Sequence, residues 1–379
     1  MSRIAVTGVG CVGASGPGSE AFAASLRDGR ALGTVESIET LRGRRREMVV
    51  ARMPGFDREA FLPQRKLRRM EESSQAWVIA CLMARSDAGL GGPSSTTPPP
   101  ERRGVFLGTG FGCTGVTWSY VRGLLADGAA TANPYLFSES VANAPAGHSA
   151  IELDARGPAV TLTCADASAA AAISAGARAI RQGRLDLAYC GGVEVLSEPL
   201  LRVLAALGSP RLVGEGAACL VLESQRSALA RAARIHALLA GTGAASDPEA
   251  LPTSWSRDPS VMEAAMRAAL AGAGAGPARA VYLHACGDPG ADDAEARAVD
   301  SVCPEAPRSS PARVVGAFSA AGAFSAAAAA LGLRVGAGGS PYTGAALVNA
   351  SAWGGSAVSL VFDRPHRDYV NESDVDARG

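Results

Sequence analysis

The sequence has no net charge, because 36 lysines and arginines balance 36 aspartates and glutamates among its 379 residues. It therefore creates no overall field that would hold nucleic acid or an anionic membrane, so a binding site for any partner must be local. It also lacks an apolar run near the roughly 20 residues of a membrane-spanning helix. The apolar stretch at residues 4–6 leads into glycines rather than a cleavage site, so we expect a soluble, unprocessed chain.

Clustered cysteines are missing as well. The eight cysteines are scattered, and most lie within apolar runs such as residues 187–190. This distribution predicts reduced, buried thiols in a cytoplasmic protein rather than a disulfide framework. We expect neither a cofactor nor a bound metal.

The chain does have ample apolar content, since 47% of its residues are apolar, enough for one large core or two fused ones. Strand-like and helix-like runs alternate, as in stacked α/β layers. Two Ala-rich helices, at 167–182 and 324–331, indicate a pseudo-duplicated fold with halves at 1–235 and 236–362, followed by a polar, mobile tail at 363–379. We expect strands at 4–6, 105–107, 160–163, 187–190, 217–222, 281–283, 314–315, 347–348 and 358–362, with further helices at 19–29, at 67–82 and from Cys113 onward.

A Gly-x-Gly-x-x-Gly motif at residues 8–13, with Asp28 and Glu36 downstream, formally fits a dinucleotide-binding fingerprint. That site needs a helix that begins at the glycines, so that the helix N-terminus meets the pyrophosphate. Pro17 and Gly18 delay the next helix too far. The motif therefore predicts a turn between a strand and a surface loop.

Several segments, in order along most of the chain, resemble the ketosynthases of fatty-acid and type II polyketide synthesis. They lie at 4–10, 108–110, 143–148, 157–158, 190–194, 214–217 and 284–295, with Asn349 and 353–355. No single segment is decisive, but their order and spacing together are specific. The resemblance implies a thiolase fold, in which five layers (αβαβα) are built from two pseudo-duplicated halves around two Ala-rich central helices.

In that family a cysteine at the N-terminus of the first central helix is the nucleophile. The family's Thr-Ala-Cys-Ala-Ser/Thr-Gly matches residues 164–169, which places Asp166 at the nucleophile position. We expect Asp166 to cap the helix and to repel a malonyl carboxylate, with a nucleophilic aspartate as the alternative. Cys164 lies two residues earlier, so we interpret it as a buried thiol rather than a displaced nucleophile.

The family's other catalytic groups are two histidines and a lysine. The first histidine motif resembles residues 284–289 and keeps His284, whereas the lysine has become Phe318 and the second histidine Ala323. Three of four catalytic positions are thus lost, and we expect no catalytic residue, with His284 serving as a structural hydrogen-bonding side chain. The segment from Glu194 to Gly214 resembles a shortened loop that no longer binds acyl substrate.

Among ketosynthase relatives this pattern resembles the chain-length factor of type II polyketide synthases, which pairs with an active ketosynthase and shapes its acyl tunnel. The expected partners are that ketosynthase, in a heterodimer, and an acyl carrier protein through the complex, with the basic residues 65–69 as a possible carrier surface. Modest side chains at the tunnel end imply a long, polyene-like product of the highly reducing type, although ordinary helix packing would also explain them. The positions that resemble tunnel residues are Phe111, Thr114, Thr117, Trp118, Val121, Leu136 and Trp353.

Two enzymatic alternatives remain open at this point. One is a malonyl-thioester decarboxylase, which would need the second histidine that Ala323 replaces. The other is a homodimeric hydrolase or acyltransferase that uses Asp166 and His284 on an acyl thioester.

Overall fold

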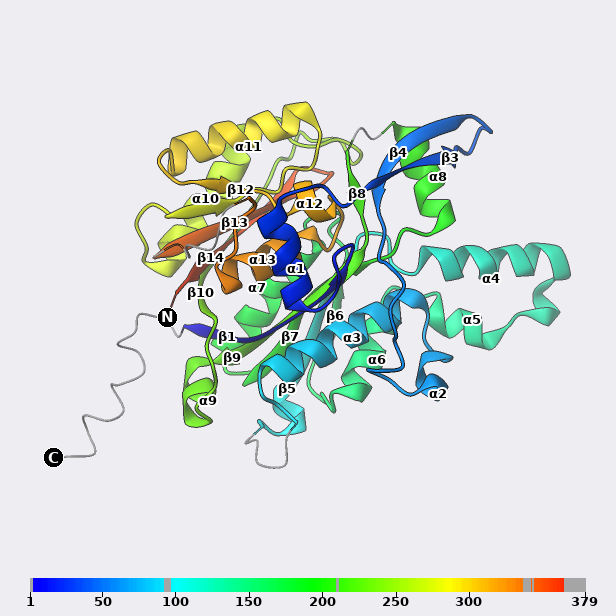
Figure 1. The fold of residues 1–379 in the computed structure, drawn as a ribbon, viewed down its shortest axis with the longest axis horizontal. Helices are drawn as coiled ribbons and strands as arrows, with labels where there is room; N and C mark the ends of the chain where they lie inside the picture. Colours follow the sequence, from blue (N-terminus) through cyan, green and yellow to red (C-terminus); the bar gives the residue numbers. More distant parts are fainter. Residues whose placement is uncertain (1–2, 92–96, 209–210, 337–341, 343, 365–379) are drawn as a thin grey trace.

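The computed structural model describes residues 3–91, 97–208, 211–336, 342 and 344–364 (Figure 1). The strands are β1 (Ile4–Gly13), β2 (Gly16–Pro17), β3 (Thr34–Glu39), β4 (Arg45–Ala51), β5 (Arg103–Gly108), β6 (Ala159–Leu162), β7 (Leu187–Glu194), β8 (Val213–Gly214), β9 (Gly216–Ser224), β10 (Ala237–Ser246), β11 (Ala280–Tyr282), β12 (Arg308–Ser309), β13 (Ala345–Ser351) and β14 (Ser356–Asp363). Eleven of them form one mixed sheet in the order β12-β11-β13-β14-β10-β1-β9-β7-β5-β6, with β2 on β1. A second sheet has the order β3-β4-β8.

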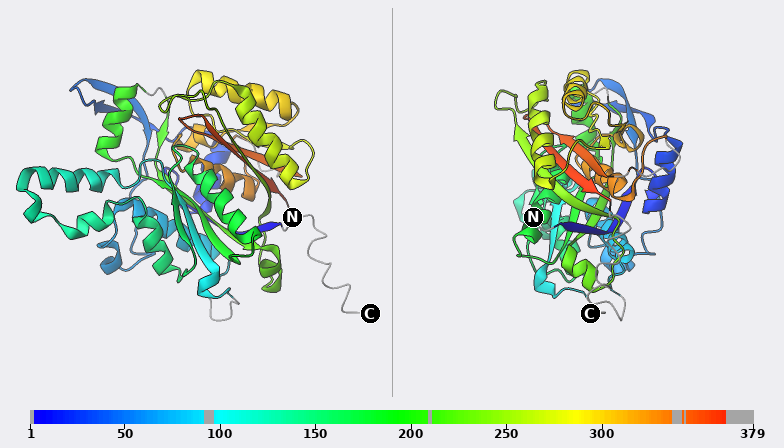
Figure 2. Two further views of the ribbon diagram at one scale, coloured as in Figure 1. Left: turned by 180° about the vertical axis from the view of Figure 1, so that it is seen from behind. Right: turned by 90° about the vertical axis from the view of Figure 1, so that its left-hand side faces the viewer.

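The helices cover both faces of the large sheet. They are α1 (Ser19–Asp28), α2 (Gln64–Leu67), α3 (Glu72–Asp87), α4 (Thr114–Asp127), α5 (Pro134–Glu139), α6 (Ala144–Glu152), α7 (Ser168–Arg181), α8 (Glu198–Leu207), α9 (Gln225–Ala230), α10 (Pro259–Ala273), α11 (Pro289–Val302), α12 (Ala312–Val315) and α13 (Ala321–Leu331). In one half α3 packs on β1 and β9, and in the other α10 packs on β10 and β14. Between the two parts of the sheet, α7 and α13 contact each other (Figures 1 and 2). The order is therefore helix, sheet, helix, sheet, helix, as the resemblance implied.

The central helix α13 is enclosed on every side. All of its residues from Ala321 to Ala330 are buried. A helix that meets close neighbours around its whole circumference must be apolar throughout, and small side chains let those neighbours approach. The Ala-rich sequence at 324–331 predicted this helix correctly, although it begins three residues earlier.

The glycines at residues 8–13 lie within β1, so the predicted turn is wrong. A Cβ on Gly8 would lie 2.1 Å from the carbonyl oxygen of Ala84, and one on Gly10 would lie 2.1 Å from that of Ala80. Glycine is required because α3 packs directly on the strand backbone. The second half repeats the device, since Gly241 and Gly243 of β10 meet the backbone of α10 equally closely, at 2.0 and 2.1 Å.

Most other expected elements are present. The helix predicted at 19–29 is α1, and Gly29 ends it with a positive φ of 72°. Residues 314–315 belong to α12, so the strand predicted there is wrong. The helix predicted at 67–82 is α3, which begins at Glu72, and Leu67 instead ends the short helix α2. The expected boundary at 235 falls between α9 and β10. Of the expected tail, residues 365–379 lie outside the described residues.

Candidate functional site

The turns before the two central helices lie side by side, and they carry positions at which the resemblance predicted lost catalysis. The amide of Ala169, in the first turn of α7, donates to the carbonyl of Ser319, just before α13, at 3.3 Å. Asp166 precedes α7 and Phe318 precedes α13, and both side chains are buried. The fold therefore brings these two predicted positions into one region.

A strained turn sets the position of Asp166. Ala165 has a positive φ of 44°, which costs a non-glycine residue on the order of 1–3 kcal/mol. The Ser168 hydroxyl holds the turn, because it accepts a hydrogen bond from the Cys164 amide at 2.8 Å and donates to the Ala165 carbonyl at 2.6 Å. The side chain of Asp166 consequently points into the protein, where it is only 2% exposed.

Asp166 does not cap α7, so that prediction is wrong. Ala167 is the N-cap residue, and no side chain caps the helix. The Asp166 carboxylate instead accepts a hydrogen bond from Nη1 of Arg211, and both members of this ion pair are buried. A guanidinium offers the carboxylate a full opposite charge, whereas a helix N-terminus offers only about half a charge.

Arg211 is the site residue that sequence reasoning missed. It follows α8, a helix that occupies much of the segment expected to be a shortened loop. Its guanidinium carbon lies 5.8 Å from the ring centroids of both Trp255 and Trp353, within cation–π range. Gly287, with φ of 85°, leaves room for it, because a Cβ there would lie 2.5 Å from the Arg211 Cβ. A lone arginine before an apolar pair, Leu212 and Val213, was the only signal in the sequence.

The ion pair between Asp166 and Arg211 therefore involves the residue that the resemblance matches to the family's nucleophile. A carboxylate that is buried and bonded to a guanidinium has lost the solvent access that an attacking group needs. Removing either partner would leave an uncompensated buried charge, which is far more costly than losing an exposed pair. The chemistry that this arrangement supports is structural.

His284 lies beside the ion pair, but its ring has the properties of a neutral group. The ring lies 5.5 Å from that of Trp255, and Nε2 has no hydrogen-bond partner within the described ranges. Burial lowers the pKa of His284 to about 4, against the opposing effect of Asp166 and with a further lowering by Arg211. The structural hydrogen bond expected of this ring is not found at Nε2. At pH 7 the ring is therefore uncharged and can offer only the N–H and the lone pair of a neutral imidazole.

The other two degenerate positions are purely apolar. Phe318 packs against Phe324, with ring centroids 5.6 Å apart, and Ala323 is fully buried within α13. Neither side chain can move a proton or orient an oxyanion. These two residues, which the resemblance matches to a lysine and a histidine, therefore provide only packing.

Glu194, at the end of β7, organises the turn that follows β5. Its Oε2 accepts hydrogen bonds from the amides of Gly110 (2.9 Å) and Phe111 (3.1 Å), and from the hydroxyls of Thr109 (3.3 Å) and Ser319. Burial raises the pKa of Glu194 to about 7, although these hydrogen bonds lower it. The carboxyl group thereby fixes the backbone that carries Phe111.

The residues that resemble tunnel positions fall into two groups. Phe111 and Trp353 contact each other, with centroids 6.2 Å apart. Since Trp353 also contacts Arg211, these two aromatic residues form one wall around the ion pair. The sequence did not indicate that this wall and the degenerate site are continuous.

The second group lies on α4 and α5, residues 114–139, which we call the arm; it projects from the body in Figure 1. The Thr114 and Ser197 hydroxyl oxygens lie 3.1 Å apart, so Thr114 faces α8. The Thr117 hydroxyl donates a hydrogen bond to the Ser140 carbonyl at 2.9 Å, and the residue is exposed. Trp118 and Val121 are also exposed, and Leu136 is half-buried.

Cys164 is exposed, whereas the other seven cysteines are buried, and all eight are free thiols. The prediction of a buried thiol is therefore wrong at this position. The reason is that Cys164 follows β6, one of the two edge strands of the large sheet, whose residues are exposed or half-buried. Asp166, only two residues later, is already buried.

Within the described ranges, no group of three or more His, Cys, Asp or Glu side chains is arranged to hold a metal ion. None of the helices in those ranges is both long enough and apolar enough to cross a membrane.

Comparison with known proteins gives matches over nearly the whole described chain. The family model for the beta-ketoacyl synthase N-terminal domain matches residues 1–228, and that for the C-terminal domain matches residues 236–336. The 3-oxoacyl-(acyl-carrier-protein) synthase 2 of Vibrio cholerae is 27% identical over 80% of this chain and 78% of its own length. Nodulation protein E of Rhizobium sp. (strain N33) is 32% identical over 75% and 73%. The solved structure described as the ishigamide ketosynthase/chain length factor aligns with a TM-score of 0.85 and 25% identity over 96% of this chain and 100% of that chain. The predicted thiolase fold is confirmed.

Proposed function

This chain belongs to the beta-ketoacyl synthase family, and we propose that it is a non-catalytic chain-length factor in which a buried ion pair stands in place of the nucleophile. In this proposal it forms a heterodimer with an active ketosynthase and shapes the acyl tunnel of that partner. The observation that carries the proposal is the bond between Asp166 and Arg211. By the motif register, Asp166 corresponds to the residue that a catalytic relative needs as a free thiol.

The surroundings of the ion pair support a loss of catalysis. Phe318 and Ala323 cannot replace a lysine and a histidine, so His284 lacks the second histidine and the lysine that the family's catalysis requires. Loss of a nucleophile abolishes covalent catalysis, and loss of one oxyanion donor alone typically costs about 10²–10³ in rate. The alternative of an enzyme that uses Asp166 and His284 is also disfavoured, because Arg211 already binds the Asp166 carboxylate.

The exposed surfaces support a second chain as partner. The arm carries large apolar side chains that are exposed to solvent in the single chain, and clusters of this kind mark interaction surfaces. The strand β6 adds an edge with free backbone groups, which sheets rarely leave uncovered. The exposed apolar residues of the arm are Trp118, Val121, Leu125, Tyr135 and Phe137.

The proposed tunnel follows from the same geometry. Thr114 and Thr117 have small side chains at the base of the arm, and Phe111 lies where the arm meets the wall around the ion pair. If the partner's tunnel ends against this region, small side chains leave space for a long acyl chain. We therefore extend the proposal to a long, polyene-like product delivered by an acyl carrier protein.

We place the pair in the cytoplasm, as the scattered cysteines indicate.

The proposal is tested by producing the chain alone and together with a ketosynthase that keeps its cysteine and two histidines. We expect the two chains to co-purify as a 1:1 heterodimer, and only the pair to condense malonyl units. Size-exclusion chromatography with light scattering gives the stoichiometry, and mass spectrometry of carrier-bound products gives the activity. A homodimer of this chain that turns over acyl thioesters by itself would refute the proposal.

A further inference from the structure

The hairpin formed by β3 and β4 ends in a basic turn that the proposed pairing does not use. We call residues 41–46, with the sequence Leu-Arg-Gly-Arg-Arg-Arg, the hairpin tip; it contains four arginines and no acidic residue. All four arginines are exposed, and within the described chain their side chains make no ion pair. The hairpin extends away from the body of the molecule (Figure 1). A projecting, uncompensated cluster of one charge attracts an oppositely charged partner.

Two acidic side chains of β3 do not neutralise the hairpin tip, because other arginines already bind them, whereas Glu47 of β4 forms no ion pair within the described chain. Arg52 forms two hydrogen bonds with Glu36, of 3.0 and 2.9 Å. Arg202 lies 3.4 Å from Glu39, although Glu39 stands directly opposite Arg45 in the strand register. The guanidinium groups of the tip therefore remain available to a partner.

The backbone of the hairpin tip is ordered by its own hydrogen bonds. The Thr40 amide donates to the Arg44 carbonyl at 2.7 Å, and the Gly43 amide donates to the Thr40 carbonyl at 3.0 Å. Gly43 supplies the positive φ of 72° that this turn requires. A held turn loses less conformational entropy on binding than a flexible basic segment would.

The inner face of the hairpin is anchored in the protein. Met48 and Val50 are buried in a cluster with Leu200, Leu201 and Leu204 of α8. Arg46 lies near Gly208, which follows α8: a Cβ added to Gly208 would be 2.8 Å from Nη1 of Arg46. Three arginines of the tip, at 42, 44 and 45, are thus free of the body, whereas Arg46 also faces α8.

The outer face combines apolar and charged groups. Val35 and Val49 are paired across the two strands, and they are 65% and 38% exposed. Leu41, in the tip itself, is 61% exposed. Apolar side chains beside arginines are typical of protein interfaces. Glu39 and Glu47 lie on the same outer face by strand alternation, so a continuous polyanion such as nucleic acid or a lipid surface would be repelled along the hairpin.

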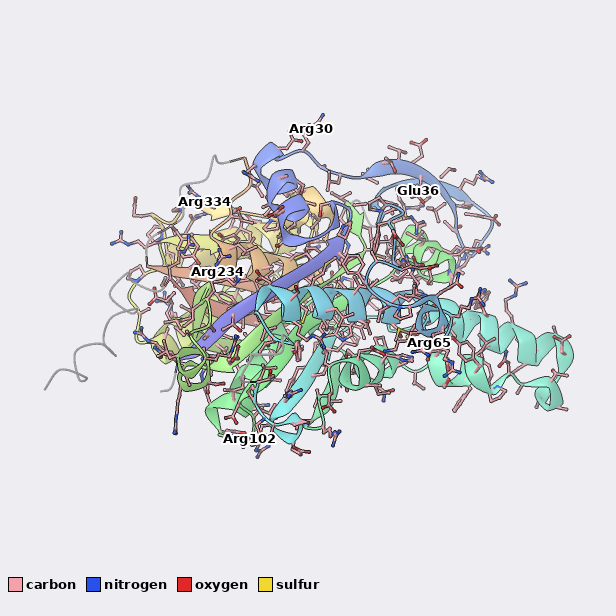
Figure 3. The ribbon with its side chains drawn as sticks, turned by 60° about the horizontal axis from the view of Figure 1, so that its bottom comes forward. Arg30, Glu36, Arg65, Arg102, Arg234 and Arg334 are labelled. Carbon is pink, nitrogen blue, oxygen red and sulfur yellow. The ribbon has the colours of Figure 1, made fainter. Side chains whose placement is uncertain are left out.

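We propose that the hairpin tip docks an acidic protein surface in which a cluster of carboxylates adjoins an apolar side chain. The guanidinium fork matches a carboxylate through two parallel hydrogen bonds, which a lysine cannot provide. The outer valines then contact the apolar part of the same partner. The site is separate from the basic residues 65–69 at α2, as the labelled Glu36 of the hairpin and Arg65 of α2 show in Figure 3.

The experiment measures binding of a labelled holo acyl carrier protein to this chain by fluorescence anisotropy. It rests on the proposed function only in the choice of the carrier protein as probe. The test variant is Arg42→Ser/Arg44→Ser/Arg45→Ser, which leaves Arg46 and its contact with α8 intact. The rival site is tested by Arg65→Ser/Arg68→Ser/Arg69→Ser, which removes the same charge from the basic residues 65–69 at α2. Equal melting temperatures of both variants establish that the fold is kept.

We expect the tip variant to bind the carrier protein at least about tenfold more weakly and with a flatter salt dependence, while the α2 variant binds as the native chain does. Unchanged binding by the tip variant, or equal losses in both variants, would overturn the proposal. Tighter binding of anionic vesicles or of duplex DNA than of the carrier protein would also overturn it. Co-purification with the ketosynthase is scored separately, so a chain that fails to pair refutes the proposed function while its binding curve still decides this inference.

Discussion

Replacing Arg211 with methionine is expected to lower the free energy of unfolding by about 3–5 kcal/mol, because Asp166 would remain buried without its partner. The effect should appear as a shift of the urea midpoint without a change in slope. Asp166→Leu should be similarly destabilising, because the guanidinium of Arg211 would remain buried beside Trp255 and Trp353 without an opposite charge.

The double variant Asp166→Leu/Arg211→Met is the decisive comparison. Replacing both charges with apolar side chains removes the desolvation cost together with the attraction, so its stability should return close to that of the native chain. Arg30→Met is a matched control, because Arg30 pairs with Asp28 on the surface, and no measurable shift is expected. If the two single variants behaved like this control, the ion pair would not be the structural centre of the site.

Enlarging Thr117 to tryptophan in the co-expressed pair is expected to shorten the polyketide product by whole extension units. Thr117 lies on the exposed side of α4, where a larger ring would occupy the proposed end of the partner's tunnel. The chain-length distribution of carrier-bound products, measured by mass spectrometry, gives the result directly.

Ser119→Trp provides the control for Thr117→Trp. Ser119 is also exposed on α4, but two residues further along the helix, and therefore on a different face. It should leave product length unchanged. Products of native length from the Thr117 variant, with the heterodimer intact, would show that this part of the arm does not limit the acyl chain.

The strands and the central helices could be predicted because short apolar runs and Ala-rich segments report burial locally. The glycines of β1 were misinterpreted because glycine in a sequence indicates a turn as readily as a close approach, and the helix that requires Gly8 and Gly10 is α3, far along the chain. Local pattern could not separate these two causes. The repeated device in β10 shows that the same ambiguity occurs in both halves.

The degenerate site could be predicted only in part. Register alone placed Asp166, Phe318 and Ala323 at the central helices, where the structure has them; their match to the family's catalytic residues stays a prediction. It could not reveal Arg211, which reaches Asp166 from a segment distant in sequence. The exposure of Cys164 was missed for a related reason, since an apolar strand gives no sign that it lies at the edge of a sheet.

A non-catalytic chain forms no covalent acyl intermediate, and intact-protein mass spectrometry can detect such an intermediate on either subunit. The purified pair is incubated with an acyl-loaded carrier protein, and each subunit is weighed. We predict that the ketosynthase gains the acyl mass on its cysteine and that this chain keeps its native mass. An acyl adduct on this chain, mapped to Asp166 or abolished by Cys164→Ser, would contradict the account.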